Sequence, residues 1–144
     1  MIADRVTLLG TVRCLCADLH ERLPAWIEET VQAICGSFGA SARVRYRCIA
    51  PPVRNDPALT ALLERSAVEQ LGADQVQRLE QPSLGAEDFA ELLQDVPGSM
   101  FRLGVAGPDG CAALHNGHFN PEEGALGVGV QVLTAAMLAW TPTP

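Results

Sequence analysis

The chain has 144 residues, of which 48% are hydrophobic and 19% charged, a composition typical of a globular protein and not of a disordered one. Its formal net charge of −7 argues against nucleic acid and against a membrane surface as partners, because both attract basic patches. No apolar run reaches the roughly eighteen residues of a membrane span, and residues 1–5 do not begin a signal peptide. We therefore expect a cytoplasmic protein.

The cysteine pattern agrees with a reducing compartment. The count of five is odd, and no pair has the Cys-x-x-Cys spacing. Cys14 and Cys16 would lie on one face at the end of a strand, but two thiols alone do not complete a zinc site. The simpler interpretation is five reduced, partly buried cysteines: Cys14, Cys16, Cys35, Cys48 and Cys111.

The first fifty residues predict a strand, a helix and a second strand. Hydrophobic and polar residues alternate over 6–14 and again over 42–49, whereas residues 18–38 have the apolar spacing of an amphipathic helix. Proline is tolerated only in a first helical turn, so we expect the regular helix to begin near Pro24. The arginines at 43, 45 and 47 form either an anion site or, more simply, the solvated face of a sheet.

A proline-rich hinge at residues 50–55 predicts a boundary between domains 1–50 and 51–144. Asp56 as N-cap and Pro57 at the first position begin the next helix, which Gly72 ends. Weaker patterns predict a strand at 75–79, a short helix at 86–93 and a buried strand at 100–105. Residues 126–140 are apolar on nearly all sides, which predicts a deeply buried last helix whose glycines touch a neighbour.

Two of the three histidines lie in one loop, just before that last helix. Asn120 is the expected N-cap, with Pro121 at the first helical position and Glu123 at the capping-box position. A histidine held beside a helix start can bind a metal or transfer a proton. His115 and His118 are therefore either functional groups or ordinary loop histidines.

Several landmarks in this half of the chain occur in a recognisable order. They are Gly85-Ala86-Glu87-Asp88-Phe89, Val96-Pro97-Gly98, Leu103-Gly104-Val105 and Leu114-His115. Their order resembles the C-terminal part of metal-dependent amidohydrolases of the aminoacylase–carboxypeptidase superfamily. The most similar branch is that of hippurate hydrolase and the indole-acetyl-amino-acid hydrolases, in which a serine stands where this chain has Ala86. The resemblance runs from about residue 2 to residue 140.

The resemblance implies an incomplete α/β fold. Residues 1–50 would be the second half of a ferredoxin-like, α+β dimerisation (lid) domain. Residues 51–144 would be the C-terminal part of an α/β zinc-peptidase catalytic domain. Such enzymes cleave N-acyl amino acids or small peptide-like amides with a two-ion zinc or manganese centre.

Within that resemblance, His115 matches a metal ligand. The general base, the cysteine ligand and the remaining ligands belong to segments that this chain lacks, so no catalytic residue is expected here. The adjacent carboxylates of Glu87 and Asp88 point about 100° apart on a helix and do not converge on one ion. The residues expected to line the site or contact substrate are Arg13, Asn55, Gly85, Glu87, Asp88, Asn116 and His118.

The chain alone is accordingly expected to be inactive. Its expected partner is a second copy, joined through the lid domain, or a complementary N-terminal half. The alternative is a non-catalytic fragment that serves as a dimerisation or assembly module. A third interpretation is an independent α+β domain.

Overall fold

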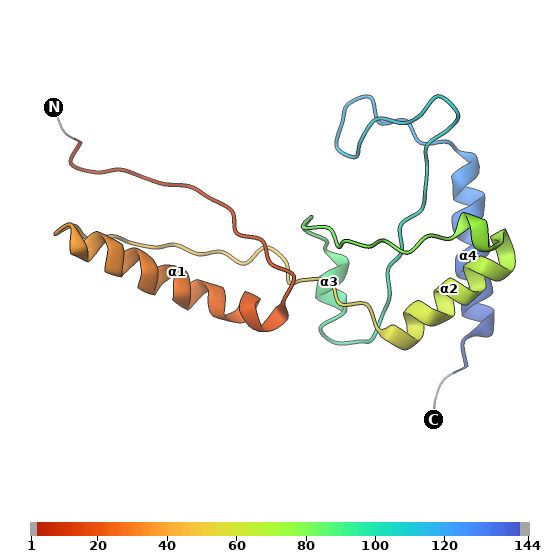
Figure 1. The fold of residues 1–144 in the computed structure, drawn as a ribbon, viewed down its shortest axis with the longest axis horizontal. Helices are drawn as coiled ribbons and strands as arrows, with labels where there is room; N and C mark the ends of the chain where they lie inside the picture. The colour runs from red at the N-terminus through yellow and green to blue at the C-terminus, as the bar shows by residue number, and fades with distance from the viewer. Residues whose placement is uncertain (1–2, 142–144) are drawn as a thin grey trace. The chain divides into compact units, whose positions relative to one another are not determined.

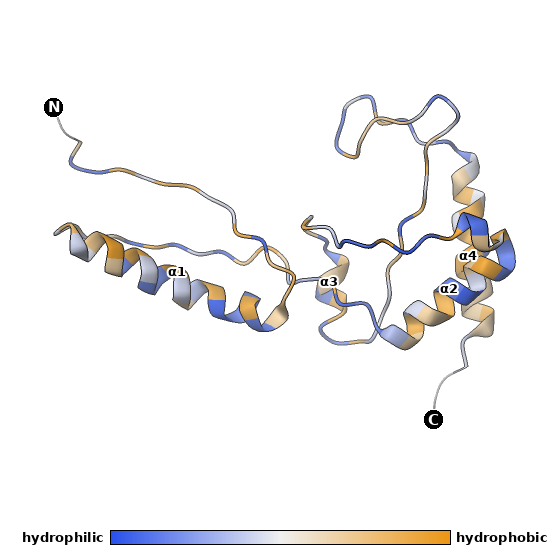
Figure 2. Ribbon diagram, viewed as in Figure 1, coloured by the Kyte–Doolittle hydropathy of each residue, from blue (hydrophilic) through white to orange (hydrophobic). Residues whose placement is uncertain are grey.

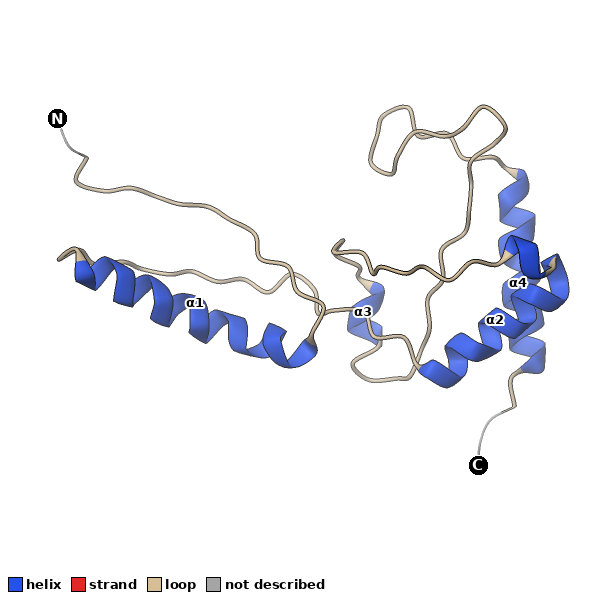
Figure 3. Ribbon diagram, in the orientation of Figure 1, coloured by secondary structure: helices blue, strands red, loops and turns tan. Residues whose placement is uncertain are grey.

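The computed structural model describes residues 3–141 of the chain. Within this range the regular elements are four α-helices and one short 3₁₀ helix, and no strand is formed (Figure 1, Figure 3). In chain order they are α1 (Ala17–Ser37), α2 (Pro57–Leu71), η1 (Ala73–Gln75), α3 (Phe89–Leu92) and α4 (Gly124–Ala139).

The chain folds as two compact units. Unit 1 comprises the described residues up to Val53 together with Gln81–Leu92. Unit 2 comprises Arg54–Glu80 and the described residues from Leu93 onward. The proline-rich hinge lies at the passage from the first unit to the second, and residues 81–92 return to unit 1.

In unit 1, α1 lies antiparallel to the extended segment 40–50. Gln32 Nε2 donates to the carbonyl of Ala42 at 3.0 Å, and His20 Nε2 lies 3.3 Å from Cys48 Sγ. From 20 to 32 a helix rises about 18 Å, and from 42 to 48 an extended chain rises about 20 Å. The two contacts therefore have matching spacings and fix the register of the segment along the helix.

Helix α1 begins earlier than we predicted. It starts at Ala17, so Pro24 lies inside it, and the expectation of a start near Pro24 was wrong. The first turn is closed ahead of the proline by a 2.9 Å bond from the His20 amide to the Cys16 carbonyl. Proline removes one later donor without undoing a turn that has already formed.

The predicted strands of unit 1 are extended segments without a ladder. No backbone hydrogen bond of the described chain joins 6–14 to 42–49. Leu8 and Leu9 should point to opposite faces of a strand, yet they are 91% and 96% exposed. The helical part of the expected α/β architecture is thus present, and its sheet is not formed by residues 3–141.

In unit 2, the start and end of α2 are as predicted. The Asp56 carboxylate accepts a 2.9 Å bond from the Leu59 amide, and Pro57 occupies the first position. Gly72 ends the helix with φ of 92°, a conformation that glycine adopts without steric cost.

The other weak patterns gave shorter or different elements. The strand predicted at 75–79 was wrong, because Gln75 closes the 3₁₀ helix η1 and residues 76–79 form no strand. The helix predicted at 86–93 is reduced to α3, one turn long. Residues 100–105 are extended and, like the segments of unit 1, have no strand partner in the described chain.

The core of unit 2 lies between α2 and α4. Val132 and Ala136 of α4 are buried, as is Ser66 of α2, and Gln131 donates to the Gln70 side chain at 3.1 Å. A Cβ at Gly129 would lie 3.1 Å from Leu103 Cδ2, so this glycine gives the close neighbour contact that we predicted. Gly127 has no such neighbour.

Helix α4 is not deeply buried, contrary to its sequence pattern. It is hydrophobic along nearly its whole length (Figure 2). Leu126, Val130, Met137 and Leu138 are nevertheless 71%, 66%, 75% and 83% exposed. The reason is that α2 and the Leu103 segment cover only one side of a helix that is apolar on all sides.

We predict that Asp56→Ala lowers the free energy of unfolding by about 1 kcal/mol, because the Leu59 amide loses its acceptor. Urea denaturation followed by far-ultraviolet circular dichroism measures the loss. Asp95→Ala is the matched control, since Asp95 is exposed in the same unit and makes no described side-chain contact. Equal losses in the two variants would contradict the capping role.

A second prediction concerns pH. Arg78 donates to both oxygens of Glu64, at 2.8 and 2.7 Å, and these bonds, reinforced by its charge, lower the pKa of Glu64. A carboxyl whose pKa is lower in the folded than in the unfolded chain stabilises the fold at pH values above its unfolded pKa of about 4.3. This stabilisation is lost as the pH falls through the folded pKa.

Arg78→Gln should therefore destabilise the chain slightly at pH 7, because the Arg78 side chain is 83% exposed. The difference from the unmodified chain should shrink as the pH falls below the unfolded pKa of about 4.3, and it should vanish once the lowered pKa of Glu64 has been passed and the carboxyl is protonated in both chains. Arg65→Gln, at an exposed arginine with no described ion pair, serves as the control. A difference that does not shrink as the pH is lowered through the acid range would refute the linkage.

Candidate functional site

The histidine loop of unit 2 spans residues 106–121 and is closed at its base. The Glu122 amide donates to the Val105 carbonyl at 2.9 Å, and the Cys111 thiol donates to the Asn120 carbonyl at 3.3 Å. A tight turn between Gly107 and Gly110, the latter with φ of 84°, forms its first corner. The loop is thus held across its two ends and not by helix α4 alone.

This closure explains why the predicted helix start was wrong. Helix α4 begins at Gly124, preceded by Glu123, which makes no side-chain cap. Asn120 and Glu122 are already engaged by Cys111 and Val105 across the base of the loop. The N-cap pattern around Pro121 was therefore overridden by contacts from residues more distant in the sequence.

His115 has the unusual backbone of this loop. Its φ is 66°, and it is the sole non-glycine residue with positive φ among those described. It is the third residue of a turn closed by a 3.1 Å bond from the Asn116 amide to the Ala113 carbonyl, a position that favours positive φ in type II turns. The imidazole is exposed. Backbone strain of this kind is concentrated at functional sites.

The two other polar candidates of the loop shape its tip. The Asn116 side-chain oxygen accepts a 2.8 Å bond from the His118 amide, and its carbonyl accepts a 2.9 Å bond from the Phe119 amide. Asn116 thereby joins two consecutive turns around His115. His118 is exposed on the second turn.

Asn55 is engaged with the segment that follows the Val-Pro-Gly turn. Its amide group donates to the Met100 carbonyl at 2.8 Å and accepts from the Met100 amide at 3.0 Å, as a strand neighbour would. The adjacent Asp56 amide donates to the Gly98 carbonyl at 2.8 Å. The structure thus gives Asn55 a structural role in joining the start of α2 to residues 98–100.

The remaining candidates lie in unit 1. The Arg13 guanidinium donates to the Leu84 carbonyl at 2.7 Å, which joins two segments 71 residues apart. Beside it, the Gly85 amide donates to the Ser83 hydroxyl at 3.0 Å, and the Glu87 carboxylate accepts from the Phe89 amide at 3.3 Å.

The structure therefore gathers the candidates into two sets. Arg13 meets the segment that carries Gly85 in unit 1, where Asp88 is exposed. His115, Asn116 and His118 share one loop of unit 2. Glu87 lies just before α3, and its carboxylate has a local structural partner in the Phe89 amide.

The described residues do not form a metal site by themselves. No group of three His, Cys, Asp or Glu side chains in residues 3–141 is arranged to hold a metal ion. A catalytic zinc normally takes three protein ligands, so His115 can supply only one part of such a centre.

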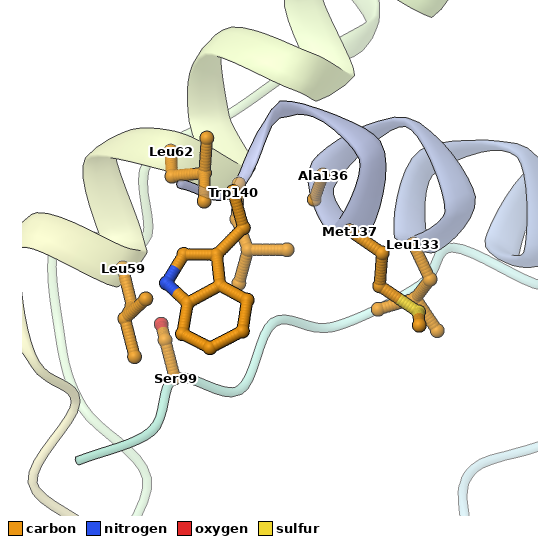
Figure 4. A pocket seen from close by; sticks show the side chains of 8 residues that line it. Leu59, Leu62, Ser99, Leu133, Ala136, Met137 and Trp140 are labelled. Carbon is orange, nitrogen blue, oxygen red and sulfur yellow. The ribbon is translucent and has the colours of Figure 1, made fainter. Parts of the chain in front are cut away.

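The sequence did not predict the apolar cavity of about 190 Å³ in unit 2. It lies between α2, α4 and the segment at Ser99, with the Trp140 indole beside Leu59 and Ser99 (Figure 4). Its one hydroxyl is bonded to Thr60 Oγ1 at 2.8 Å, so the cavity offers no reactive group. The spacing of the leucines predicted the apolar face of each helix, but it did not predict that the two faces would line one pocket. Its lining is Leu59, Leu62, Leu63, Ser99, Leu133, Ala136, Met137 and Trp140.

Comparison with known proteins places this loop in a family context. The profile of peptidase family M20/M25/M40 matches residues 2–139. No solved structure matches the chain significantly. None of the helices in the described part is long and apolar enough to cross a membrane.

Three curated relatives illustrate the match. A protein of Synechocystis sp., provisionally named a hydrolase, is 44% identical over 142 residues, or 97% of this chain and 36% of the relative. A Bacillus subtilis protein provisionally named an amidohydrolase is 35% identical over the same shares. The N-acetyldiaminopimelate deacetylase of Anoxybacillus flavithermus is 34% identical over 93% of this chain and 34% of the relative.

The chain thus spans about a third of the length of the curated relatives that it matches. Nearly all of its residues nevertheless fall within the family profile, including both extended segments and the histidine loop. The chain belongs to peptidase family M20/M25/M40.

Proposed function

We propose that the chain is the C-terminal part of a metal-dependent amidohydrolase, in which His115 is one metal ligand. The observation that carries the proposal is the closed loop that holds the exposed His115 imidazole at a positive φ. A strained, exposed histidine on a loop with fixed ends is placed to bind a ligand without rearrangement. Family members generally depend on divalent metals, which supports the assignment.

The proposed reaction is hydrolysis of an N-acyl amino acid or a small peptide-like amide. It rests on the relatives, two of which have names that denote an amidohydrolase and an N-acetyl amino acid deacetylase. The motif order from Gly85 to His115 favours the branch of hippurate hydrolase and the indole-acetyl-amino-acid hydrolases. Arg13, Asp88, Asn116 and His118 are the proposed site-lining residues with exposed side chains.

We propose that the centre holds two zinc or manganese ions and is completed by residues that this chain does not contain. Because residues 3–141 offer no cluster of three ligand side chains, we assign no catalytic step to this chain alone. Asn55, Gly85 and Glu87 would then position the walls of the site, since their polar atoms are engaged with Met100, Ser83 and Phe89.

The proposed partner completes the α/β fold. Residues 1–50 would be half of a dimerisation domain and residues 51–144 the end of a catalytic domain. The segments 6–14 and 42–49 are extended but unpaired in the described chain, and Leu8 and Leu9 are almost fully exposed. Added strands would supply both the backbone partners and the cover, from a complementary N-terminal half or a second copy. Five free thiols are compatible with a cytoplasmic location.

The same exposed segments favour a second candidate function, that of a non-catalytic assembly module. The two candidates differ in their dependence on His115. An assembly module needs the surfaces of unit 1 alone, whereas a hydrolase also needs the imidazole of unit 2.

We predict that the chain by itself does not hydrolyse a panel of N-acyl amino acids in the presence of zinc or manganese. The physical reason is that one histidine cannot hold a catalytic metal ion. Release of the free amino acid measures the reaction. Turnover that is lost in His115→Gly would show that the chain already contains a complete centre, contrary to the proposal.

A chimaera tests the ligand assignment. This chain would replace the matching third of the Anoxybacillus flavithermus deacetylase, and deacetylation of N-acetyldiaminopimelate would be measured with added metal. We expect detectable activity that His115→Gly lowers by at least about 100-fold, as loss of a metal-site interaction does.

Glycine is the chosen replacement because it adopts positive φ without strain, so the loop should keep its shape. Asp109→Ala, at an exposed residue of the same loop with no described side-chain contact, is the matched control and should retain most of the activity. A chimaera whose activity survives His115→Gly, or one that is inactive although folded, would overturn the proposal.

A further inference from the structure

Unit 1 contains a pair of reactive side chains that the proposed hydrolysis does not use. Cys48 Sγ and His20 Nε2 are 3.3 Å apart, a sulfur–nitrogen hydrogen bond between residues 28 positions apart in the sequence. Cys48 is exposed, so its thiol is open to small reagents, and His20 is half-buried on α1. Neither residue belongs to a motif that the sequence pattern singled out for function.

The pair is fixed by the packing of segment 40–50 along α1. The bond between Gln32 and Ala42 sets the register at the far end of the segment. At the near end, the His20 amide is bonded to the Cys16 carbonyl at 2.9 Å, which places the imidazole on the first full turn of the helix. The register of the two elements thus brings the thiol and the imidazole within reach of each other.

The other cysteines differ in their surroundings. Cys14 and Cys111 are half-buried, and their thiols lie against the carbonyls of Cys16 and Asn120. A carbonyl accepts a hydrogen bond from a thiol but cannot take its proton. Cys35 is half-buried, and Cys16 is exposed without a basic neighbour among the described contacts. Cys48 alone in the described chain combines an exposed thiol with a contacting base.

We propose that Cys48 is a modification site, at which the thiol forms a mixed disulfide with a low-molecular-weight disulfide and His20 takes up the thiol proton. In the neutral imidazole tautomer with a bare Nε2, the thiol donates its hydrogen bond to that nitrogen. The thiolate is the form of cysteine that attacks a disulfide, so a base in contact with the thiol promotes the reaction.

The exchange is balanced without a further reagent. The Cys48 proton passes to His20 Nε2, and the thiolate sulfur attacks one sulfur of the small disulfide. A new S–S bond forms at Cys48 as the old S–S bond breaks, and the electron pair leaves with the second sulfur. The departing thiolate then accepts the proton from His20. One disulfide and one thiol are consumed, and one disulfide and one thiol are produced.

The test is the rate of reaction of each cysteine of the full chain with 4,4′-dithiodipyridine at pH 7. Peptide mapping by mass spectrometry assigns the modified residue. We expect Cys48 to react first and His20→Gln to slow that residue by roughly threefold to tenfold, because glutamine keeps a polar contact but accepts no proton. The rates of the other four cysteines in the same sample serve as internal controls and should not change.

Two further arms separate proton transfer from packing. Added imidazole should restore the Cys48 rate in His20→Ala, which a purely structural role would not produce. In denaturant the Cys48 rate of the unmodified chain should fall to that of the other cysteines, which tests the pair even if a variant fails to fold. Faster reaction at Cys16 than at Cys48, or an unchanged Cys48 rate in His20→Gln, would overturn the proposal.

Discussion

The geometry of the histidine loop in unit 2 depends on the backbone hydrogen bond from Glu122 to Val105. It closes the histidine loop, removes Glu122 from the helix and sets the start of α4 at Gly124. With the loop closed, two short turns fit around Asn116 and hold His115 at positive φ. The tip of the loop is held by hydrogen bonds between its own residues, and the His115 imidazole is exposed there.

Features that depend on neighbouring residues were predictable from the sequence. The Asp56 cap and the Gly72 stop of α2 each follow from contacts within a few positions. The N-cap expected at Asn120 failed because Val105 and Cys111, which lie well before it in the sequence, compete for the same backbone groups. The Cys48–His20 pair and the Arg13–Leu84 bond likewise arise from packing of distant segments, which periodicity does not encode.

The predicted sheet shows where sequence pattern and structure diverge most. Alternating residues at 6–14 and 42–49 adopt an extended backbone, but a ladder requires a neighbouring strand. Leu8, Leu9 and the outer side of α4 remain exposed, although burying a leucine side chain is worth roughly 2 kcal/mol. The chain belongs to peptidase family M20/M25/M40, and its matched relatives are about three times as long, which supports the proposal that further segments cover these surfaces.

The chain has a preformed histidine loop in unit 2 and, in unit 1, extended segments without strand partners among residues 3–141. Amide hydrogen exchange of the isolated chain tests both halves in one experiment. The account predicts a protected amide at Glu122 and nearly unprotected amides throughout 6–13 and 42–49, because only the first has a backbone partner in the described structure. Fast exchange at Glu122, or protection across both extended segments, would contradict it.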